Sequence, residues 1–147
     1  NIFDDTKLLS VNEQILTQSK DAGEILGLFN TVLNTVSYDN YPISSEAVVQ
    51  QLLYMYLKGI CNSVTAELHS SKGRADLVIE SDNRRIVFEF KYAENETEAK
   101  AKLSEAVEQI KTRDYGNILP KKNELLRIAT VFNADPKVRA FTEYQEV

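Results

Sequence analysis

Three consecutive runs of alternating apolar and polar residues constrain the fold of this chain more than any other feature. The runs cover residues 64–69, 75–79 and 86–92, and a turn at 70–73 separates the first two. Successive side chains of a β-strand point to opposite faces, so each run predicts a strand with one buried face. Asp82 and Asn83, which precede the third run, tolerate the positive φ angles of tight hairpins. We therefore expect a three-stranded antiparallel meander.

Helical spacing of apolar residues predicts helices on both sides of this meander. The spacing runs through 6–36 with a break at 21–23, which indicates two helices. Residues 96–113 have the highest helix propensity in the chain. The apolar face of this later helix is formed by Ala99, Leu103, Ala106, Val107 and Ile110. We expect it to lie across the sheet.

One more helix and two more strands complete the expected order. Ser44 or Ser45 can cap a helix that runs to Lys58, with Gly59 as its stop signal. The expected buried stripe of this helix is Val48, Leu52, Met55 and Tyr56. The apolar run 125–132 predicts a strand covered on both faces, and 138–144 predicts an edge strand. The chain is thus expected to be an α/β protein.

Composition excludes several classes of protein. The 147 residues are 43% hydrophobic and 27% charged, which is typical of one compact globular domain. No apolar run is long enough to span a membrane and no signal peptide is recognisable, so we expect a soluble, cytoplasmic protein. The net charge of -5 argues against nonspecific coating of nucleic acid. With only Cys61 and His69, a zinc cluster is excluded, and any metal must have oxygen ligands.

The residues that carry chemistry gather on the second and third strands of the meander. Glu89 and Lys91 share one face of the third strand. If the hairpin turns at Asp82–Asn83, Asp76 lies directly opposite Glu89. Like charges in such a pair are destabilising, so the pair needs a compensating cation, a raised pKa or a different register, and a divalent metal is the natural occupant. Mg²⁺, with Mn²⁺ as a substitute, suits two carboxylates, the Phe90 backbone carbonyl and several waters.

The acidic–any–lysine triplet centred on Phe90 has meaning only through its position. Such triplets occur four times, and the other three lie near the amino terminus, on the 96–113 helix and beside Pro136. Next to a bound cation, Lys91 can neutralise charge in the transition state of phosphodiester hydrolysis, while the cation acidifies the attacking water. The alternative is a solvated ion pair between Glu89 and Lys91.

Two segments resemble the signature of the PD-(D/E)XK nuclease superfamily, with Ala75 in place of the usual proline. They are Gly73-Arg74-Ala75-Asp76-Leu77-Val78-Ile79 and Phe88-Glu89-Phe90-Lys91. The resemblance implies a restriction-endonuclease-like core of a helix, a three-strand meander, a helix and a strand at 41–147, after a helical extension at 1–40. More narrowly, the chain resembles the subgroup that follows an AAA-type ATPase-like domain in bacterial proteins. The missing initiator Met fits a piece of such a parent.

The resemblance also implies the roles of individual residues. The implied metal and catalytic centre comprises Asp76, Glu89, Lys91, Glu46 and the backbone carbonyl of Phe90. Its carboxylates would bind the metal and its lysine would serve catalysis. Glu67, on the polar face of the first strand of the meander, is the alternative to Glu46 as the third carboxylate.

Five further residues are expected to contact substrate: Gln109, Tyr115, Arg74, Lys121 and Lys122. Gln109 and Tyr115 resemble a later motif of the family, although a solvated helix face explains Gln109 equally well. The two lysines belong to the segment 111–127, whose local charge of +3 can steer phosphates, with solubility as the alternative reason for that charge.

The leading hypothesis is a metal-dependent nuclease domain whose partner is nucleic acid, DNA ahead of RNA. One alternative is a catalytically silent binding or regulatory module that works through an ATPase-containing parent. Another is an oligomerisation element, such as a homodimer, because the helices of 1–40 carry enough apolar surface to pair two copies.

Overall fold

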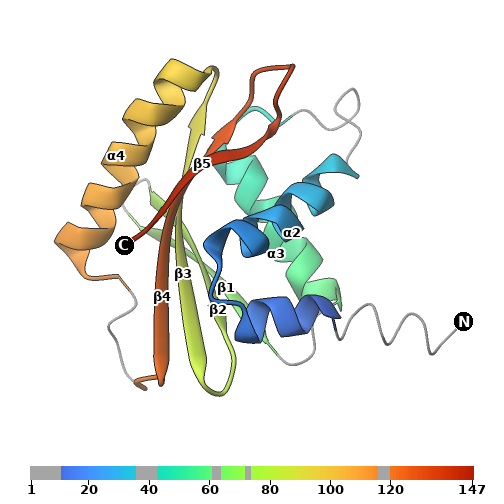
Figure 1. The fold of residues 1–147 in the computed structure, drawn as a ribbon, viewed down its shortest axis with the longest axis vertical. Coiled ribbons are helices and arrows are strands. Elements are labelled where there is room, and N and C mark those ends of the chain that lie inside the picture. Colours follow the sequence, from blue (N-terminus) through green and yellow to red (C-terminus); the bar gives the residue numbers. More distant parts are fainter. Residues whose placement is uncertain (1–10, 36–42, 61–63, 72–73, 116–119) are drawn as a thin grey trace, which may run out of the picture.

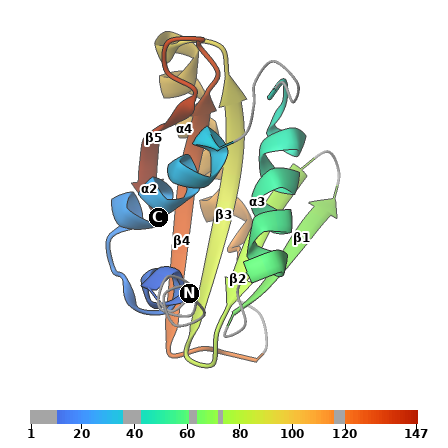
Figure 2. The same cartoon turned by 90° about the vertical axis from the view of Figure 1, so that its right-hand side faces the viewer.

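The computed structural model describes residues 11–35, 43–60, 64–71, 74–115 and 120–147. Its elements are α2 (Ala22–Asn34), α3 (Glu46–Ile60), β1 (Thr65–Ser71), β2 (Arg74–Glu80), β3 (Arg84–Ala93), α4 (Glu96–Arg113), β4 (Glu124–Asn133) and β5 (Ala140–Glu146). Residues 11–18 are also helical. The strands form one sheet in the order β1-β2-β3-β4-β5, with α4 on one face and α2 and α3 on the other (Figures 1 and 2). Among the described helices, none is long and apolar enough to cross a bilayer.

The predicted meander and its register are confirmed. Strands β1, β2 and β3 pair antiparallel in sequence order. The Ser81 N–H donates to the Arg84 carbonyl at 2.9 Å, which closes the hairpin at Asp82–Asn83. This turn pairs Asp76 with Glu89, as expected. The other turn is shorter than expected, because β1 and β2 take in residues 70, 71 and 74, and residues 72–73 lie outside the described part.

The second half of the fold also follows the prediction. Helix α4 spans the expected residues, from the Asn95 N-cap, whose side chain accepts from the Glu98 N–H, to Asp114 in the left-handed conformation. It connects β3 to β4 as a crossover, so these two strands run parallel. Strand β5 lies at the edge and pairs antiparallel with β4 across a bulge at Val131 and Phe132. The mixed α/β sheet is consistent with a restriction-endonuclease-like fold.

The main core lies between the sheet and the helices α2 and α3. Phe88 and Phe90 of β3 face this core, as the strand alternation predicts, and their rings stack with centroids 5.5 Å apart. Phe29 of α2 packs on Phe88 at 5.1 Å. A smaller core under α4 contains Ala106, Val107, Ile110 and Ala129. Because β3 is covered on both faces, polar residues on its second face are enclosed.

The buried stripe of α3 is not the one expected from the sequence. The buried apolar residues of this helix are Val49, Leu53 and Leu57. Met55 is 68% exposed, and Val48, Leu52 and Tyr56 lie half-buried at the margin of the core. Adjacent apolar residues, as at Val48–Val49, fit two helical phases about 100° apart, so the periodicity alone does not choose between them. The helix also continues through Gly59 to Ile60, so Gly59 is not its stop.

Polar contacts attach the amino-terminal helices to the sheet. The Asn30 side chain of α2 accepts from the Phe141 N–H at 2.8 Å and donates to the Phe141 carbonyl at 3.2 Å. At the start of β3, the buried Arg84 donates to the Ser19 carbonyl at 2.6 Å and pairs with Glu124 at 3.0 Å. The described part of the amino-terminal extension therefore shares one core with the sheet.

Candidate active site

The candidate site begins with two acidic residues at the point where β2 and β3 part. Pairing of β2 with β3 ends at Asp76 and Glu89. Beyond that pair, β3 pairs only with β4 through Ala93, and β2 pairs only with β1 through Arg74. The side chain of Asp76 lies outside the described part of the chain, so its placement rests on the backbone register. This register is the arrangement predicted from the hairpin turn.

Glu89 is enclosed by the sheet and by α4. Its side chain is 1% exposed, and Lys91 Nζ lies 3.6 Å from Glu89 Oε1. Lys91 itself is 14% exposed. A carboxylate removed from water is costly unless cations or hydrogen-bond donors surround it. The structure therefore rules out the solvated ion pair that was the alternative explanation for these two residues.

Glu46 is the third carboxylate that the resemblance implies for this site. It is the first residue of α3, where the helix dipole favours negative charge. Burial raises the pKa of Glu46 above its usual value, the charges of Lys91 and Lys102 lower it, and Glu105 raises it. The charges of Lys91 on β3 and of Lys102 on α4 thus partly offset the effect of burial on this carboxyl. Glu67, by contrast, is exposed on the edge strand β1, so Glu46 has the better position as a third ligand.

Lys102 and Glu105, which the sequence analysis did not single out, carry charges that act on Glu46. Both lie on α4, and their side chains form an ion pair with 3.4 Å between Nζ and Oε2. Glu105 and Gln109 follow Lys102 by three and seven residues, so all three lie on one side of the helix. This spacing is the sequence signal that could have identified Lys102 and Glu105. Gln109 shares this flank, and its side-chain oxygen is buried with no hydrogen-bond partner among the described residues. This burial does not fit a plain solvated helix face.

The other predicted substrate-binding residues divide between the end of α4 and the segment before β4. Tyr115 follows α4, where its hydroxyl accepts from Arg113 at 3.2 Å and its side chain packs against the cluster that includes Ala129, the register partner of Glu89. Lys122 lies 3.9 Å from Glu80, and Lys121 is its neighbour in the segment before β4.

The register between β3 and β4 shows how far the segment before β4 lies from Glu89. Glu124 pairs with Arg84, five residues before Glu89, a separation of roughly 17 Å along the strand. The structure therefore does not bring Lys121 and Lys122 to the acidic pair. The side chain of Arg74 lies outside the described part.

The residues present fit a divalent metal ion. Carboxylate and carbonyl oxygens are the ligands that Mg²⁺ and Mn²⁺ prefer. Phe90 follows Glu89 on the stretch of β3 that no longer pairs with β2, and its side chain packs in the core. Among the side chains that the structure describes, no group of three acidic, His or Cys residues converges. A complete ligand set therefore requires Asp76.

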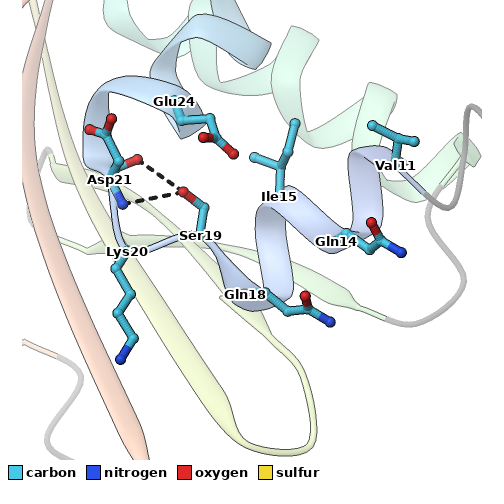
Figure 3. A pocket seen from close by; sticks show the side chains of 8 residues that line it. All are labelled: Val11, Gln14, Ile15, Gln18, Ser19, Lys20, Asp21 and Glu24. Atoms are coloured by element: carbon cyan, nitrogen blue, oxygen red, sulfur yellow. Dashed lines mark hydrogen bonds between the residues drawn. The ribbon is translucent and has the colours of Figure 1, made fainter.

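A separate pocket lies on the amino-terminal helices, away from this acidic pair (Figure 3). It has a volume of about 640 Å³ and opens between the helical segment 11–18 and the start of α2. In its wall, the Ser19 hydroxyl accepts from the Asp21 N–H at 3.2 Å, and Asp21 caps α2 through the Gly23 N–H at 2.8 Å. Its polar groups serve helix capping, and none of the predicted site residues lines it.

A comparison with protein families agrees with this geometry. Residues 44–142 match the family model described as the PD-(D/E)XK nuclease superfamily. The match includes the meander, α4 and the whole acidic site. Nucleases of this superfamily generally use divalent metals and act on nucleic acid. No curated protein matches the chain.

Proposed function

Because this chain belongs to the PD-(D/E)XK nuclease superfamily, we propose that it hydrolyses phosphodiester bonds of nucleic acid with a divalent metal ion. The observation that carries the proposal is the buried Glu89 beside Lys91, with Asp76 opposite in register. Two acidic residues opposite each other destabilise the sheet unless something compensates for their charges. A bound cation would supply that compensation.

Asp76, Glu89 and Glu46 would hold the metal, together with the backbone carbonyl of Phe90. Mg²⁺ is the proposed ion, with Mn²⁺ as a substitute, because oxygen ligands on a rigid strand suit it. When bound, the ion would lower the pKa of the attacking water and stabilise the charge of the phosphate.

The protein side chains would position the substrate around that ion. The ammonium group of Lys91 is held beside Glu89 and would neutralise an oxygen of the reacting phosphate. The carboxylate of Glu89 would orient this lysine as well as bind metal. The side-chain oxygen of Gln109 on α4 is buried with no hydrogen-bond partner among the described residues, and the amide of this residue would bond to the substrate.

The test is cleavage of DNA and RNA substrates with Mg²⁺ or Mn²⁺ by the wild type and by Asp76→Asn, Glu89→Gln and Lys91→Met. We expect metal-dependent cleavage by the wild type and a loss of at least about 100-fold in each variant, since each removes a group that acts on the transition state. Unchanged cleavage by Asp76→Asn would contradict the proposal. Glu46→Gln and Glu67→Gln form a matched pair, in which only the first should lower the rate.

Finer features of the function are also proposals. The resemblance supports DNA ahead of RNA as the substrate, and a bacterial parent protein in which an AAA-type ATPase-like domain precedes this one. We propose that 41–147 is the nuclease unit and that 1–40 is an extension that supports it. Contacts of Arg84 and Asn30 between the sheet and the amino-terminal helices favour this supporting role.

A further inference from the structure

The two edges of the sheet differ in how they are protected. At β5, Asn30 of α2 bonds to both the N–H and the carbonyl of Phe141, and a bulge at Val131 and Phe132 interrupts the pairing with β4. Such devices keep the unpaired backbone groups of an edge strand from recruiting another strand. At the other edge, β1 pairs only with β2 among the described strands (Figure 2). Its seven residues include no Pro, Lys or Arg, and its register with β2 has no bulge. The edge of β1 is therefore open to a further strand.

The sequence of β1 is complementary to itself. Leu68 is the central residue of this strand, so two antiparallel copies that overlap completely pair residues whose numbers sum to 136. Leu68 then pairs with the partner's Leu68, and Thr65 pairs with the partner's Ser71. Glu67 pairs with the partner's His69, and symmetry makes this pair twice. An imidazole N–H can donate to a carboxylate whether or not the ring is charged. The side chain of His69 lies outside the described part, so its pairing rests on the register.

Other registers of the same pairing are worse. A two-fold axis perpendicular to the sheet keeps each face on the same side in both copies, so the paired numbers can shift only by two. A sum of 134 sets Glu67 against the partner's Glu67, and like charges in such a pair are destabilising. A sum of 138 sets Glu67 against the partner's Ser71 and loses the pair with His69. Each of these shifts also leaves two residues of β1 without a partner.

Helix α3 adds a second surface beside this edge. It packs over β1, and its Tyr56 hydroxyl accepts from Asn12 at 3.0 Å, so that flank of the helix faces the segment 11–18. Helical geometry puts Ala47, Tyr54 and Lys58 on the opposite flank, toward the edge of β1. Lys58 Nζ lies 5.8 Å from the centre of the Tyr54 ring. Tyrosine is enriched in protein interfaces. In a continuous sheet the two copies of α3 lie antiparallel on one face, with these flanks toward each other.

We propose that this chain forms a symmetric dimer in which the β1 strands of two copies pair antiparallel about Leu68. The two sheets then become one, and the same surface of each copy forms the interface. The charge complementarity of Glu67 and the partner's His69 selects a second copy as the occupant of this edge. Formation of the dimer requires neither metal nor nucleic acid.

Disulfide cross-linking tests the register. The full chain carries Cys61→Ser, with either Leu68→Cys or Ala66→Cys, and is mildly oxidised before electrophoresis without reductant. Cysteines at position 68 would lie directly opposite each other, with Cα atoms about 4.5–5.5 Å apart, which allows a disulfide. Cysteines at position 66 would lie four residues apart along the strands, roughly 13 Å, which is too far. We expect a covalent dimer only from Leu68→Cys. No cross-link from Leu68→Cys, or equal cross-linking of both variants, overturns the inference.

Sedimentation equilibrium in chelator tests the pairing without new cysteines. We expect Glu67→Lys to raise the dissociation constant of the dimer at least about tenfold, because symmetry removes two pairs at once. Glu146→Lys, at an exposed position on the other edge strand, is the control and should dimerise like the wild type. The exchange Glu67→His with His69→Glu should restore the dimer. A wild type that stays monomeric at its highest soluble concentration, or a Glu67→Lys variant that dimerises like the wild type, overturns the inference.

Discussion

Glu89 is a charged side chain that the fold keeps at a cost. It lies in the middle of a strand covered on both faces, and its side chain is 1% exposed. Removal of a carboxylate from water costs several kcal/mol, and Lys91 at 3.6 Å offsets part of that cost. The acidic residue opposite, Asp76, adds to it. A bound cation would lower both costs, which is the reason we propose for two acidic residues at this position.

Glu46 gives a prediction about stability and pH. Because burial raises its pKa above the usual 4.5, the folded protein holds this proton more tightly than the unfolded chain does. The contribution of Glu46 to the free energy of unfolding is therefore fully present below the pKa that this residue has in the unfolded chain. It is lost as the pH rises through the pKa that the residue has in the folded protein. In chelator, Glu46→Gln should gain in melting temperature over the wild type as pH rises above about 4.5.

Thermal unfolding, followed by circular dichroism at several pH values below and above about 4.5, measures the difference in melting temperature between Glu46→Gln and the wild type. Glu146→Gln, which removes an exposed carboxylate at the end of β5, is the control for the loss of one surface charge. A gap between Glu46→Gln and the wild type that stays constant with pH, or that shrinks as pH rises, would contradict the assignment.

At the scale of elements, the hairpin and α4 were predictable and α3 was not. The Asp82–Asn83 turn fixes the β2–β3 register, and α4 has clear signals at both ends, so local sequence determines both features. In α3, adjacent apolar residues leave the helical phase open, and only contact with the sheet chooses Leu53 over Met55. From the sequence alone, Arg84 would be expected at the surface. Its burial depends on Ser19, which is 65 positions away in the chain.

Arg84 gives a prediction about how the elements are joined. Its guanidinium donates to backbone carbonyls at the end of the helical segment 11–18 and pairs with Glu124. Arg84→Met removes the donor to the buried Leu16 carbonyl and the half-buried Ser19 carbonyl and should lower the free energy of unfolding by about 2–3 kcal/mol. Arg113→Met, at an exposed position, should change it by less than about 0.5 kcal/mol. Urea unfolding of both variants measures the difference, and equal values would show that Arg84 does not anchor the helix.

At the scale of the whole molecule, the candidate site lies at the end of the sheet where β2 and β3 no longer pair. Helix α3 lies on one face and α4 on the other, with β3 between them (Figure 2). Glu46 of α3 nevertheless responds to charges on α4, at the end of the sheet where β2 and β3 no longer pair. The sequence predicted the acidic pair through strand register. It could not predict the effect of the Lys102 charge on the pKa of Glu46, because that effect depends on how two helices pack on one sheet.

The central claim is that the acidic pair of β2 and β3 binds a divalent cation. Calorimetric titration of Mn²⁺ into the wild type and into Asp76→Asn tests it most directly, since the substitution keeps the shape of the side chain and removes its charge. We expect saturable binding by the wild type that is lost in Asp76→Asn, and a Mn²⁺-dependent rise in melting temperature only for the wild type. No binding by the wild type, or equal binding by both proteins, would contradict the claim.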